Sequence, residues 1–497
     1  MRAGEAAALA LLAACARQPL EEAPRGEGTA PAAEAAAVAE APSPAEATGL
    51  HPGDLRALVG AGVQDGPLGA ILAAGRAEPG AMALLTTLCD DVGHRLAGSP
   101  GLDAAVVWAD GALRAVGGLR VWTEPVMVPV WRRGRERAWV TAPRELELPM
   151  LGLGGSGGTP GVEAEVVVVD SPEAVGPEVA GKIVLFDKAM RPLPPNDPSY
   201  RGRDAYGEAV GIRGGGPAAA AQHGAAGALV RSVTGASLGT PHTGGTWFGE
   251  AKPIPAAAIT PEHAGWMRRL IRRGVTVRVR LEMEAQTLPD ALSHNVLGEL
   301  RGARWPDEVV LIGAHLDSWD VGQGAQDDGS GVAQVIEAMR LLARAPVPPD
   351  RTVRAVLFTN EENGLRGGKD YAKVHAAERH VAAIESDLGA GWPVQLDAEG
   401  DPAQMAYLSA AAAPLGLPVV AGHGGADIGP LAESGVLVVN LIPDDRSYFD
   451  VHHTWADTLD KVDPAALQEG ALVLAGLAWG LATAPAAPGP RAAAPAP

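Results

Sequence analysis

Short apolar runs alternate with helical segments through the C-terminal half of the chain, and this alternation limits the possible folds more than any other feature. Strands joined through helices favour a mixed, mostly parallel sheet covered by helices on both faces. We therefore predict an α/β domain from residues 50–125 and 286–483, because helical apolar spacing also precedes Val121. The elements predicted in the C-terminal half are strands at Asn295–Leu300, Val309–Ile312, Thr352–Phe358, Ala382–Ile384 and Val436–Leu441, and a helix at Ser330–Ala343.

The pattern changes between the two parts of this domain. Short β-rich runs such as Ala164–Val169 and Lys182–Phe186 are separated there by stretches rich in Gly and Pro. This change indicates that residues 126–285 form an inserted, mostly β domain. Within the insertion, the segment Pro241–Gly244 could reach a cleft, although a simple turn is the more ordinary interpretation.

The N-terminal residues 1–15 have the pattern of an export signal. The apolar run Ala6–Ala14 is too short to span a bilayer and ends at Cys15. The string Leu12–Cys15 resembles the lipobox of bacterial lipoproteins, in which the cysteine carries the lipid. We predict export to the periplasm or cell envelope with a lipid anchor at Cys15, while another exported form and a cytoplasmic protein remain open alternatives.

Composition sets limits on the remaining segments and on partners. Residues 16–49 consist almost entirely of Ala, Pro, Glu, Gly and Arg, and residues 484–497 have the same character. Such segments cannot bury enough apolar surface to offset their ordering entropy, so we predict a disordered tether and a disordered tail. The net charge of −19 argues against a nucleic-acid partner, because phosphate binding needs a basic stripe. The two cysteines, Cys15 and Cys89, provide no disulfide framework.

Potential metal ligands begin directly after the predicted strand Val309–Ile312. His315 and Asp317 follow this strand, and Asp327 precedes the helix that begins at about Ser330. Zinc binds imidazole nitrogen and carboxylate oxygen in sites that keep a position open for water. Because Asp317 lies on the same face of an extended segment as His315, we expect its carboxylate to accept the other N–H of the imidazole. By itself, this segment is equally compatible with a solvated acidic loop.

Further candidates follow the later strands. Glu361 and Glu362 come after Thr352–Phe358, where one glutamate could bind metal while its neighbour holds a proton. Asp387 and a His-His pair ending at His453 follow the next two strands. Each of these features is ordinary when taken singly. Their order, with each following a predicted strand, favours one site, because ligands gather at the carboxyl ends of strands in such sheets.

The order of these residues and their local strings resemble the M28 family of co-catalytic zinc peptidases. The similarity runs from about Leu50 to Gly480. It implies a zinc-exopeptidase fold with a protease-associated domain as the insertion, placed over the metal site so that it limits substrate size. The segments that carry the similarity are Gly313–Gly322, Asn360–Gly368, Phe449–Thr458 and His94–Gly101 for the family, and Ala180–Leu185 and Gly224–Val230 for the inserted domain.

The resemblance implies a ligand set for two zinc ions. Asp327 would bridge both ions through its two oxygens. One ion would also bind His315 and Asp387, and the other Glu362 and His453. No position in this set departs from the family pattern, which argues against a degenerate relative without catalytic activity.

The resemblance also implies roles for the remaining candidates. Glu361 would be the general base that takes a proton from the water between the ions and passes it to the leaving amine. Asp317 matches the family's supporting carboxylate. We prefer His453 over His452 as the ligand, because the family's ligand stands immediately before Thr or Ser.

The implied substrates are short peptides, with dipeptides carrying two free termini favoured. Aminopeptidase, carboxypeptidase and dipeptidase specificity all remain open, because pocket walls carry no short motif. Relatives also suggest a homodimer, on which the sequence itself is silent. The alternatives are a single-zinc acyl transferase of the glutaminyl-cyclase type and a binding protein of the transferrin-receptor type that lacks catalytic activity.

Overall fold

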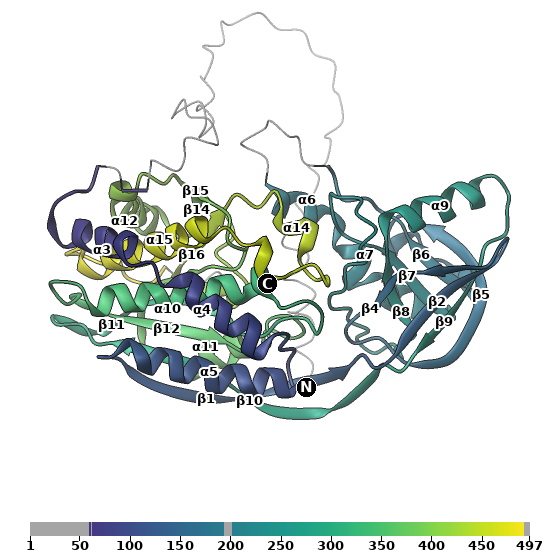
Figure 1. Cartoon of the computed structure of the whole chain (residues 1–497), viewed down its shortest axis with the longest axis horizontal. Coiled ribbons are helices and arrows are strands. Elements are labelled where there is room, and N and C mark those ends of the chain that lie inside the picture. The colour runs from purple at the N-terminus through teal and green to yellow at the C-terminus, as the bar shows by residue number, and fades with distance from the viewer. Residues whose placement is uncertain (1–58, 61, 193–200, 492–497) are drawn as a thin grey trace, which may run out of the picture.

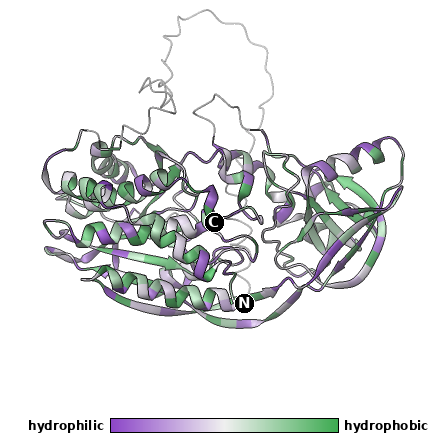
Figure 2. Cartoon of the chain, viewed as in Figure 1, coloured by the Kyte–Doolittle hydropathy of each residue, from purple (hydrophilic) through white to green (hydrophobic). Residues whose placement is uncertain are grey.

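The computed structural model describes residues 59–60, 62–192 and 201–491, which form two lobes joined by a long two-stranded ribbon (Figure 1). Strand β1 (Arg120–Arg132) and strand β10 (Gln286–Leu300) form this ribbon and pair antiparallel over most of their length. The expected export signal at residues 1–15, with Cys15, and the expected tether at 16–49 lie outside the described residues. Apolar residues concentrate in the strands and in the helices packed on them (Figure 2).

The first lobe is built on an eight-stranded sheet with the order β1-β10-β12-β11-β13-β16-β14-β15. The strands β12, β11, β13 and β16 are parallel to one another. Strand β1 is antiparallel to β10, β10 to β12 and β14 to β16, whereas the edge strand β15 is parallel to β14. The predicted α/β fold with a mixed sheet is therefore confirmed. The further strands are β11 (Trp305–His315), β12 (Arg351–Phe358), β13 (Arg379–Glu385), β14 (Pro393–Glu399), β15 (Val419–Ala421) and β16 (Leu437–Pro443).

Helices cover both faces of this sheet. One face carries the larger apolar cluster, to which α3, α5, α10, α12 and α15 contribute, and the opposite face packs against α11 and α13. The parallel strands are thus buried on both sides, as their continuous apolar runs predict. The helices of this lobe are α3 (Gly66–Ala77), α4 (Ala81–Thr87), α5 (Pro100–Val116), α10 (Ser330–Ala343), α11 (Arg366–Val374), α12 (Pro402–Ala412), α13 (Gly429–Glu433), α14 (Tyr448–Val451) and α15 (Pro464–Thr483).

Two elements show how well apolar periodicity predicts this lobe. Helix α10 has the predicted bounds, and nearly all of its residues are buried, including the polar Gln334 and Glu337. Strand β14 has no counterpart in the prediction, because the buried polar residues Gln395 and Asp397 interrupt its apolar run. These two side chains hydrogen-bond to each other, which satisfies part of their polarity inside the fold.

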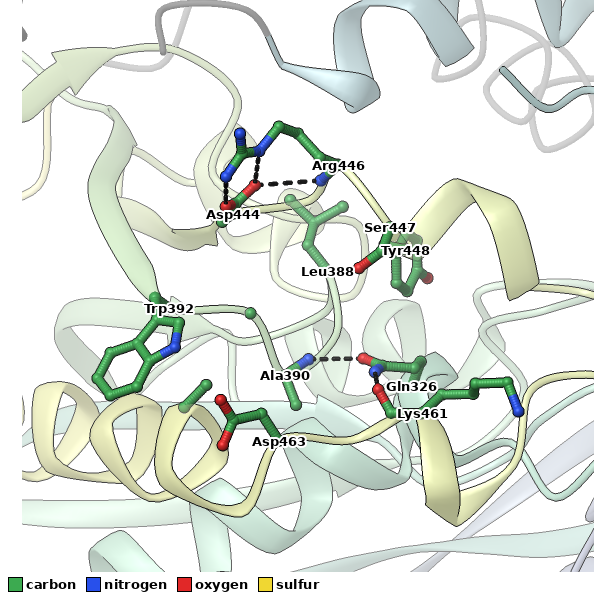
Figure 3. Close-up of a pocket in the computed structure, with 12 residues that line it drawn as sticks. Gln326, Leu388, Ala390, Trp392, Asp444, Arg446, Ser447, Tyr448, Lys461 and Asp463 are labelled. Carbon is green, nitrogen blue, oxygen red and sulfur yellow. Dashed lines mark hydrogen bonds and ion pairs between the residues drawn. The ribbon is translucent and has the colours of Figure 1, made fainter. Parts of the chain in front are cut away.

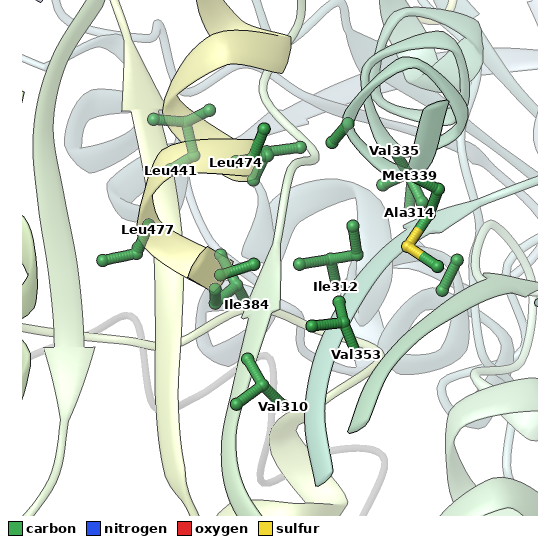
Figure 4. Packing of buried hydrophobic residues seen from close by; sticks show 14 of the residues in the cluster. Val310, Ile312, Ala314, Val335, Met339, Val353, Ile384, Leu441, Leu474 and Leu477 are labelled. Atoms are coloured by element: carbon green, nitrogen blue, oxygen red, sulfur yellow. The ribbon is translucent and has the colours of Figure 1, made fainter. Parts of the chain in front are cut away.

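Helix α15 forms the centre of the larger apolar cluster. Its length and composition would allow it to cross a membrane, yet 83% of its most apolar window is buried inside the lobe. Leu474 and Leu477 point toward Ile312, Ile384 and Leu441 of the sheet (Figure 4). Helix α15 is therefore the core helix of this lobe.

The second lobe contains an eight-stranded sheet of its own, with the order β3-β2-β9-β5-β6-β7-β8-β4. The predicted boundary at residue 126 falls inside β1, which continues to Arg132 before the chain enters the second sheet. The elements of this lobe are β2 (Glu136–Ala142), β3 (Leu146–Leu148), β4 (Met150–Gly152), β5 (Thr159–Val169), β6 (Ile183–Phe186), β7 (Gly227–Arg231), β8 (Ala256–Ile259) and β9 (Arg278–Met283), with helices α6 (Gly202–Ala209), α7 (Gly211–Gly214), α8 (Gly216–Gln222) and α9 (Pro261–Arg272).

The C-terminal tail differs from the prediction over its first residues. Residues 484–491 lie against the first lobe, whereas disorder is predicted from residue 484 onward. The Arg491 backbone N–H donates to Gly435 O at 2.9 Å, and its guanidinium pairs with Glu399. These polar contacts fix a segment that buries little apolar surface. The tail residues 492–497 lie outside the described residues.

We predict that Leu474→Ala lowers the free energy of unfolding by about 2–5 kcal/mol, because the side chain is fully buried and its loss leaves a cavity. Urea denaturation followed by circular dichroism measures the change. Val107→Ala is the control, since Val107 is 74% exposed and its truncation should change stability by less than about 0.5 kcal/mol. Equal effects of the two substitutions would contradict the assignment of α15 as a core helix.

Candidate metal centre

Three of the predicted site residues lie at the carboxyl ends of neighbouring parallel strands. His315 is the last residue of β11, Glu362 follows the end of β12 at Phe358, and Asp387 follows the end of β13. Because these strands are adjacent and parallel in the sheet, their ends meet at one edge. The sheet therefore delivers these three side chains to one place.

Asp327 and His453 complete the group from loops. Asp327 lies in an irregular turn, Ala325–Gly329, immediately before α10. His453 follows strand β16, as predicted, with the short helix α14 between them. The helix intervenes because Tyr448 and Phe449 turn into the core between the lobes.

The two oxygens of Asp327 face two different histidines. Asp327 Oδ1 lies 3.2 Å from His315 Nε2, and Asp327 Oδ2 lies 3.0 Å from His453 Nε2. Asp387 Oδ1 lies 3.3 Å from His315 Nε2, and Glu362 Oε2 lies 3.2 Å from His453 Nε2. The five side chains thus form two groups of three that share Asp327, and the ligand atoms of each group lie within 4.8 Å of one another.

These separations fit a tetrahedral zinc ion. Zinc–nitrogen and zinc–oxygen bonds of about 2.0–2.2 Å place neighbouring ligand atoms roughly 3.3–3.6 Å apart, close to the separations seen here. In addition, Glu362 Oε1 is buried and has no hydrogen-bond partner among the described residues, so it retains an unused acceptor inside the group. Each group contains imidazole nitrogen and carboxylate oxygen, the ligand types that zinc prefers.

The electrostatics of the group favour cations. Burial alone would lower the pKa of His315, but the charge of Asp387 and a hydrogen bond to Asp327 raise it well above its usual value. Burial also lowers the pKa of His453, and here the charge of Glu362 and a hydrogen bond to Asp327 reverse the effect. Since both imidazoles are drawn toward the cationic form, the carboxylates around them attract positive charge.

Glu361 lies beside the two groups without belonging to either of them. Burial raises the pKa of its carboxyl group well above the usual value, and the neighbouring charges of Asp387, Glu362 and Asp317 raise it further. The side chain is partly exposed, so a molecule in the site can reach it. A carboxylate in these surroundings readily accepts and holds a proton.

Asp317 supports the site through different atoms from those expected. The acceptor nearest to His315 Nδ1 is the backbone carbonyl of Asp317, at 3.0 Å, whereas the Asp317 carboxylate lies 3.8 Å away. The carboxylate instead accepts the backbone N–H groups of Glu361 at 3.0 Å and Glu362 at 3.3 Å. The expectation that the carboxylate itself fixes the tautomer of His315 is therefore wrong, because the carboxylate is turned toward these two amides and the backbone carbonyl is the nearer acceptor.

Two further residues hold the loops of the site. The Asp457 carboxylate accepts the backbone N–H groups of Gln326 at 2.7 Å and Asp327 at 3.2 Å. Arg95, which is fully buried, donates to the carbonyls of Leu316 and Gly324, on the chain between His315 and Asp327. Both residues belong to strings that carry the family resemblance, which is the sequence signal for their importance.

The second lobe also reaches the site. The Thr243 backbone N–H donates to His453 O at 3.0 Å, and Thr243 O lies 3.3 Å from His453 Nδ1. Arg213 Nη1 donates a hydrogen bond to Thr243 O at 3.1 Å. The segment Pro241–Gly244 therefore contacts the site, and the interpretation as a simple turn is wrong.

A pocket of ≈ 460 Å³ has sequence neighbours of two of the candidate ligands in its wall, but none of the five candidate ligands themselves (Figure 3). Gln326 and Leu388, the sequence neighbours of Asp327 and Asp387, line it together with Tyr448. Hydrogen bonds from the backbone N–H of Ala390 to the side chain of Gln326, and from this side chain to Lys461 O, fix the Gln326 amide in the wall. This pocket provides space for part of a small molecule next to Gln326 and Tyr448.

The match to known proteins covers most of the chain. The family model for Peptidase family M28 matches residues 295–478. Carboxypeptidase Q of Xenopus laevis is 38% identical over 404 residues, which are 78% of this chain and 83% of that protein. The chain belongs to peptidase family M28. The prediction of a metallopeptidase of this family is therefore confirmed.

Solved structures support the same fold. The crystal structure of a Peptidase M28 precursor from Shewanella amazonensis has a TM-score of 0.80 and 38% identity, covering 86% of this chain and 98% of that one. The zinc aminopeptidase BSAP from Bacillus subtilis has a TM-score of 0.59 at 19% identity, covering 82% of this chain and 95% of that one, so it shares the fold. Both comparisons extend beyond the residues matched by the M28 family model.

We predict that zinc raises the melting temperature of the protein, because an ion that binds only the folded state stabilises it. At a free ion concentration 100 times the dissociation constant, each occupied site adds about 2.7 kcal/mol. Differential scanning fluorimetry with and without zinc measures the shift.

Two variants of carboxylate residues test whether zinc raises the melting temperature by binding at this site. Asp327→Asn should lose most of the zinc-dependent shift, because Asp327 belongs to both groups of ligands. Asp307→Asn should retain the full shift, since Asp307 is exposed near the opposite end of β11 from His315. A wild-type protein whose melting temperature does not respond to zinc would contradict the metal centre.

Proposed function

We propose that this M28 peptidase is an exopeptidase that binds two zinc ions and hydrolyses short peptides. The observation that carries the proposal is the Asp327 carboxylate, whose two oxygens face two separate groups of ligands. One ion would be held by His315, Asp327 and Asp387, and the other by Asp327, Glu362 and His453. Each ion would then have three protein ligands, which leaves the fourth position of a tetrahedral zinc site for water or substrate.

Bound zinc would polarise the scissile carbonyl and make water a better acid. The Glu361 carboxylate would take a proton from the attacking water and later deliver it to the leaving amine. Burial and the neighbouring carboxylates raise the pKa of Glu361, which supports this role because a carboxylate with a raised pKa is a stronger base. Asp317 would keep Glu361 in position by binding its backbone N–H.

The substrate class follows from the resemblance and from the available space. The pocket beside Gln326 and Tyr448 would hold one end of a short peptide. The second lobe, which contacts His453 through Thr243, would act as a roof that keeps longer chains out. We propose dipeptides with free termini as the preferred substrates, and we interpret residues 126–285 as a protease-associated domain.

The cellular location of the enzyme is a separate proposal. The N-terminal pattern of residues 1–15 supports export to the periplasm or cell envelope, with Cys15 as the site of lipid attachment. Mass spectrometry of the membrane fraction would detect the lipidated cysteine, whereas Cys15→Ser should release the protein into the soluble fraction. A homodimer is a further proposal that rests on relatives alone.

We predict that Glu361→Gln lowers kcat by about 10²- to 10⁴-fold, the usual contribution of a general base, while both zinc ions remain bound. Steady-state hydrolysis of a dipeptide gives kcat, and inductively coupled plasma mass spectrometry gives zinc per chain. Glu362→Gln is the matched control, because it should lose zinc as well as activity.

Several outcomes would overturn parts of this proposal. Normal turnover by Glu361→Gln would remove Glu361 from the role of base. One zinc ion per chain in the wild-type protein would argue for the single-zinc chemistry of a glutaminyl-cyclase-like acyl transferase. A protein with two zinc ions that cleaves no peptide would favour a binding role.

A further inference from the structure

His453 is held from outside its own lobe, unlike the other histidine of the metal centre. His315 ends strand β11, and its Nδ1 lies 3.0 Å from the backbone carbonyl of Asp317, two residues later. His453 lies outside the helices and strands, and its φ of +62° belongs to the left-handed region that residues with a side chain rarely adopt. The contacts of its backbone carbonyl and of its Nδ1 come from Thr243 of the second lobe. The orientation of His453 therefore depends on a contact between the lobes.

The Thr243 carbonyl determines which ring nitrogen of His453 can bind a metal ion. If Nε2, which faces Asp327 and Glu362, is to bind zinc, Nδ1 must carry the proton of the neutral ring. The described residues place two polar groups at hydrogen-bond distance from Nδ1, Thr243 O and Arg213 Nη1, each at 3.3 Å. A guanidinium nitrogen can only donate, so the proton on Nδ1 has Thr243 O as its acceptor. This carbonyl thus favours the tautomer in which Nε2 is free to bind metal.

Thr243 is itself fixed by contacts with both lobes. Its side chain is fully buried, and its hydroxyl donates to Gly152 O at 2.7 Å within the second lobe. Arg133 Nη2 donates to the same hydroxyl at 3.3 Å and also pairs with Asp320 of the first lobe at 2.5 Å. Asp320 lies on the chain between two of the candidate ligands. The Thr243 hydroxyl therefore keeps the main-chain atoms of this residue in place beside the metal centre.

We propose that Thr243 is a positioning residue through which the second lobe holds His453 as a zinc ligand. The inference rests on the proposed function, in which two zinc ions are bound, and adds that the two ions depend on different parts of the fold. The first lobe alone fixes the imidazole of His315, whereas the second lobe fixes that of His453. Loosening Thr243 should therefore weaken the binding of one ion selectively.

The test compares Thr243→Val with Thr243→Ser in the full-length protein. Valine has nearly the same shape as threonine but lacks the hydroxyl, and Gly152 O keeps Arg133 Nη1 as a donor, so the fold should remain intact. Titration with zinc against a competing chelator gives the dissociation constant of each ion. We expect Thr243→Val to bind the ion beside His453 about 10- to 100-fold more weakly, the usual effect of losing a group that orients a metal ligand, with the other ion unchanged. Thr243→Ser keeps the hydroxyl and should behave as the wild type.

Two further measurements separate this role from a general loss of structure. Anomalous diffraction from Thr243→Val crystals at limiting zinc should show a full peak beside His315 and a reduced peak beside His453. Dipeptide hydrolysis by the same variant should lose kcat at limiting zinc and recover it at higher free zinc, with KM unchanged.

Gly244→Ala tests the same carbonyl by another route. Gly244 has a φ of +136°, and a side chain there would collide with the guanidinium of Arg213, so the peptide unit that carries Thr243 O has to shift. This variant should weaken the ion beside His453 at least as strongly as Thr243→Val. The matched control is Gly239→Ala, which also replaces a left-handed glycine, with φ +70°, but whose side chain would meet nothing within 4 Å.

The control for the hydroxyl is Thr246→Val, which removes a comparable buried hydrogen bond, from Thr246 Oγ1 to Gly214 O at 3.2 Å. It should leave both dissociation constants unchanged. The inference would be overturned by Thr243→Val binding both ions as tightly as the wild type, by equal weakening of both ions, or by an equal effect of Thr246→Val. A wild-type protein that binds a single ion would overturn both this inference and the proposed function. Two bound ions without any peptide cleavage would count against the proposed function alone.

Discussion

A single buried carboxylate organises the site on which the function of this protein depends. Asp327 presents one oxygen to His315 and the other to His453, so each oxygen belongs to a different group of ligands. Further carboxylates, on Glu362 and Asp387, lie close by, and their mutual repulsion has to be balanced by positive charge. The concentrated negative charge makes this arrangement unstable without cations, and the same charge makes it a good binding site for them.

The fold holds these charges through backbone groups. Three ligands come from the ends of adjacent parallel strands, whose positions are fixed by the sheet. The remaining loops are held by buried side chains that bind main-chain atoms, as Asp317 does for the Glu361 and Glu362 amides and Asp457 for the Asp327 amide. Because these supports are themselves buried, the ligands have little freedom to move apart.

The sequence predicts the part of this arrangement that depends on local pattern. Apolar runs locate the strands before His315 and Asp387, and the family resemblance of the strings after them points to the five side chains that the structure brings together. Contacts between the lobes could not be predicted in the same way. Arg213 and His453 are 240 residues apart, and no periodicity or motif connects them. The acceptor for His315 Nδ1 was also beyond prediction, because the carbonyl and carboxylate of Asp317 lie on one residue and only geometry separates them.

The central claim is that Asp327 is shared by two metal ions, and anomalous diffraction at the zinc absorption edge tests it most directly. In crystals of the zinc-loaded protein, we expect two peaks about 3.5–4 Å apart, the usual spacing in two-metal sites. One peak should lie beside His315 and the other beside His453, with the Asp327 carboxylate between them. A single peak, or two peaks that do not flank Asp327, would contradict the account.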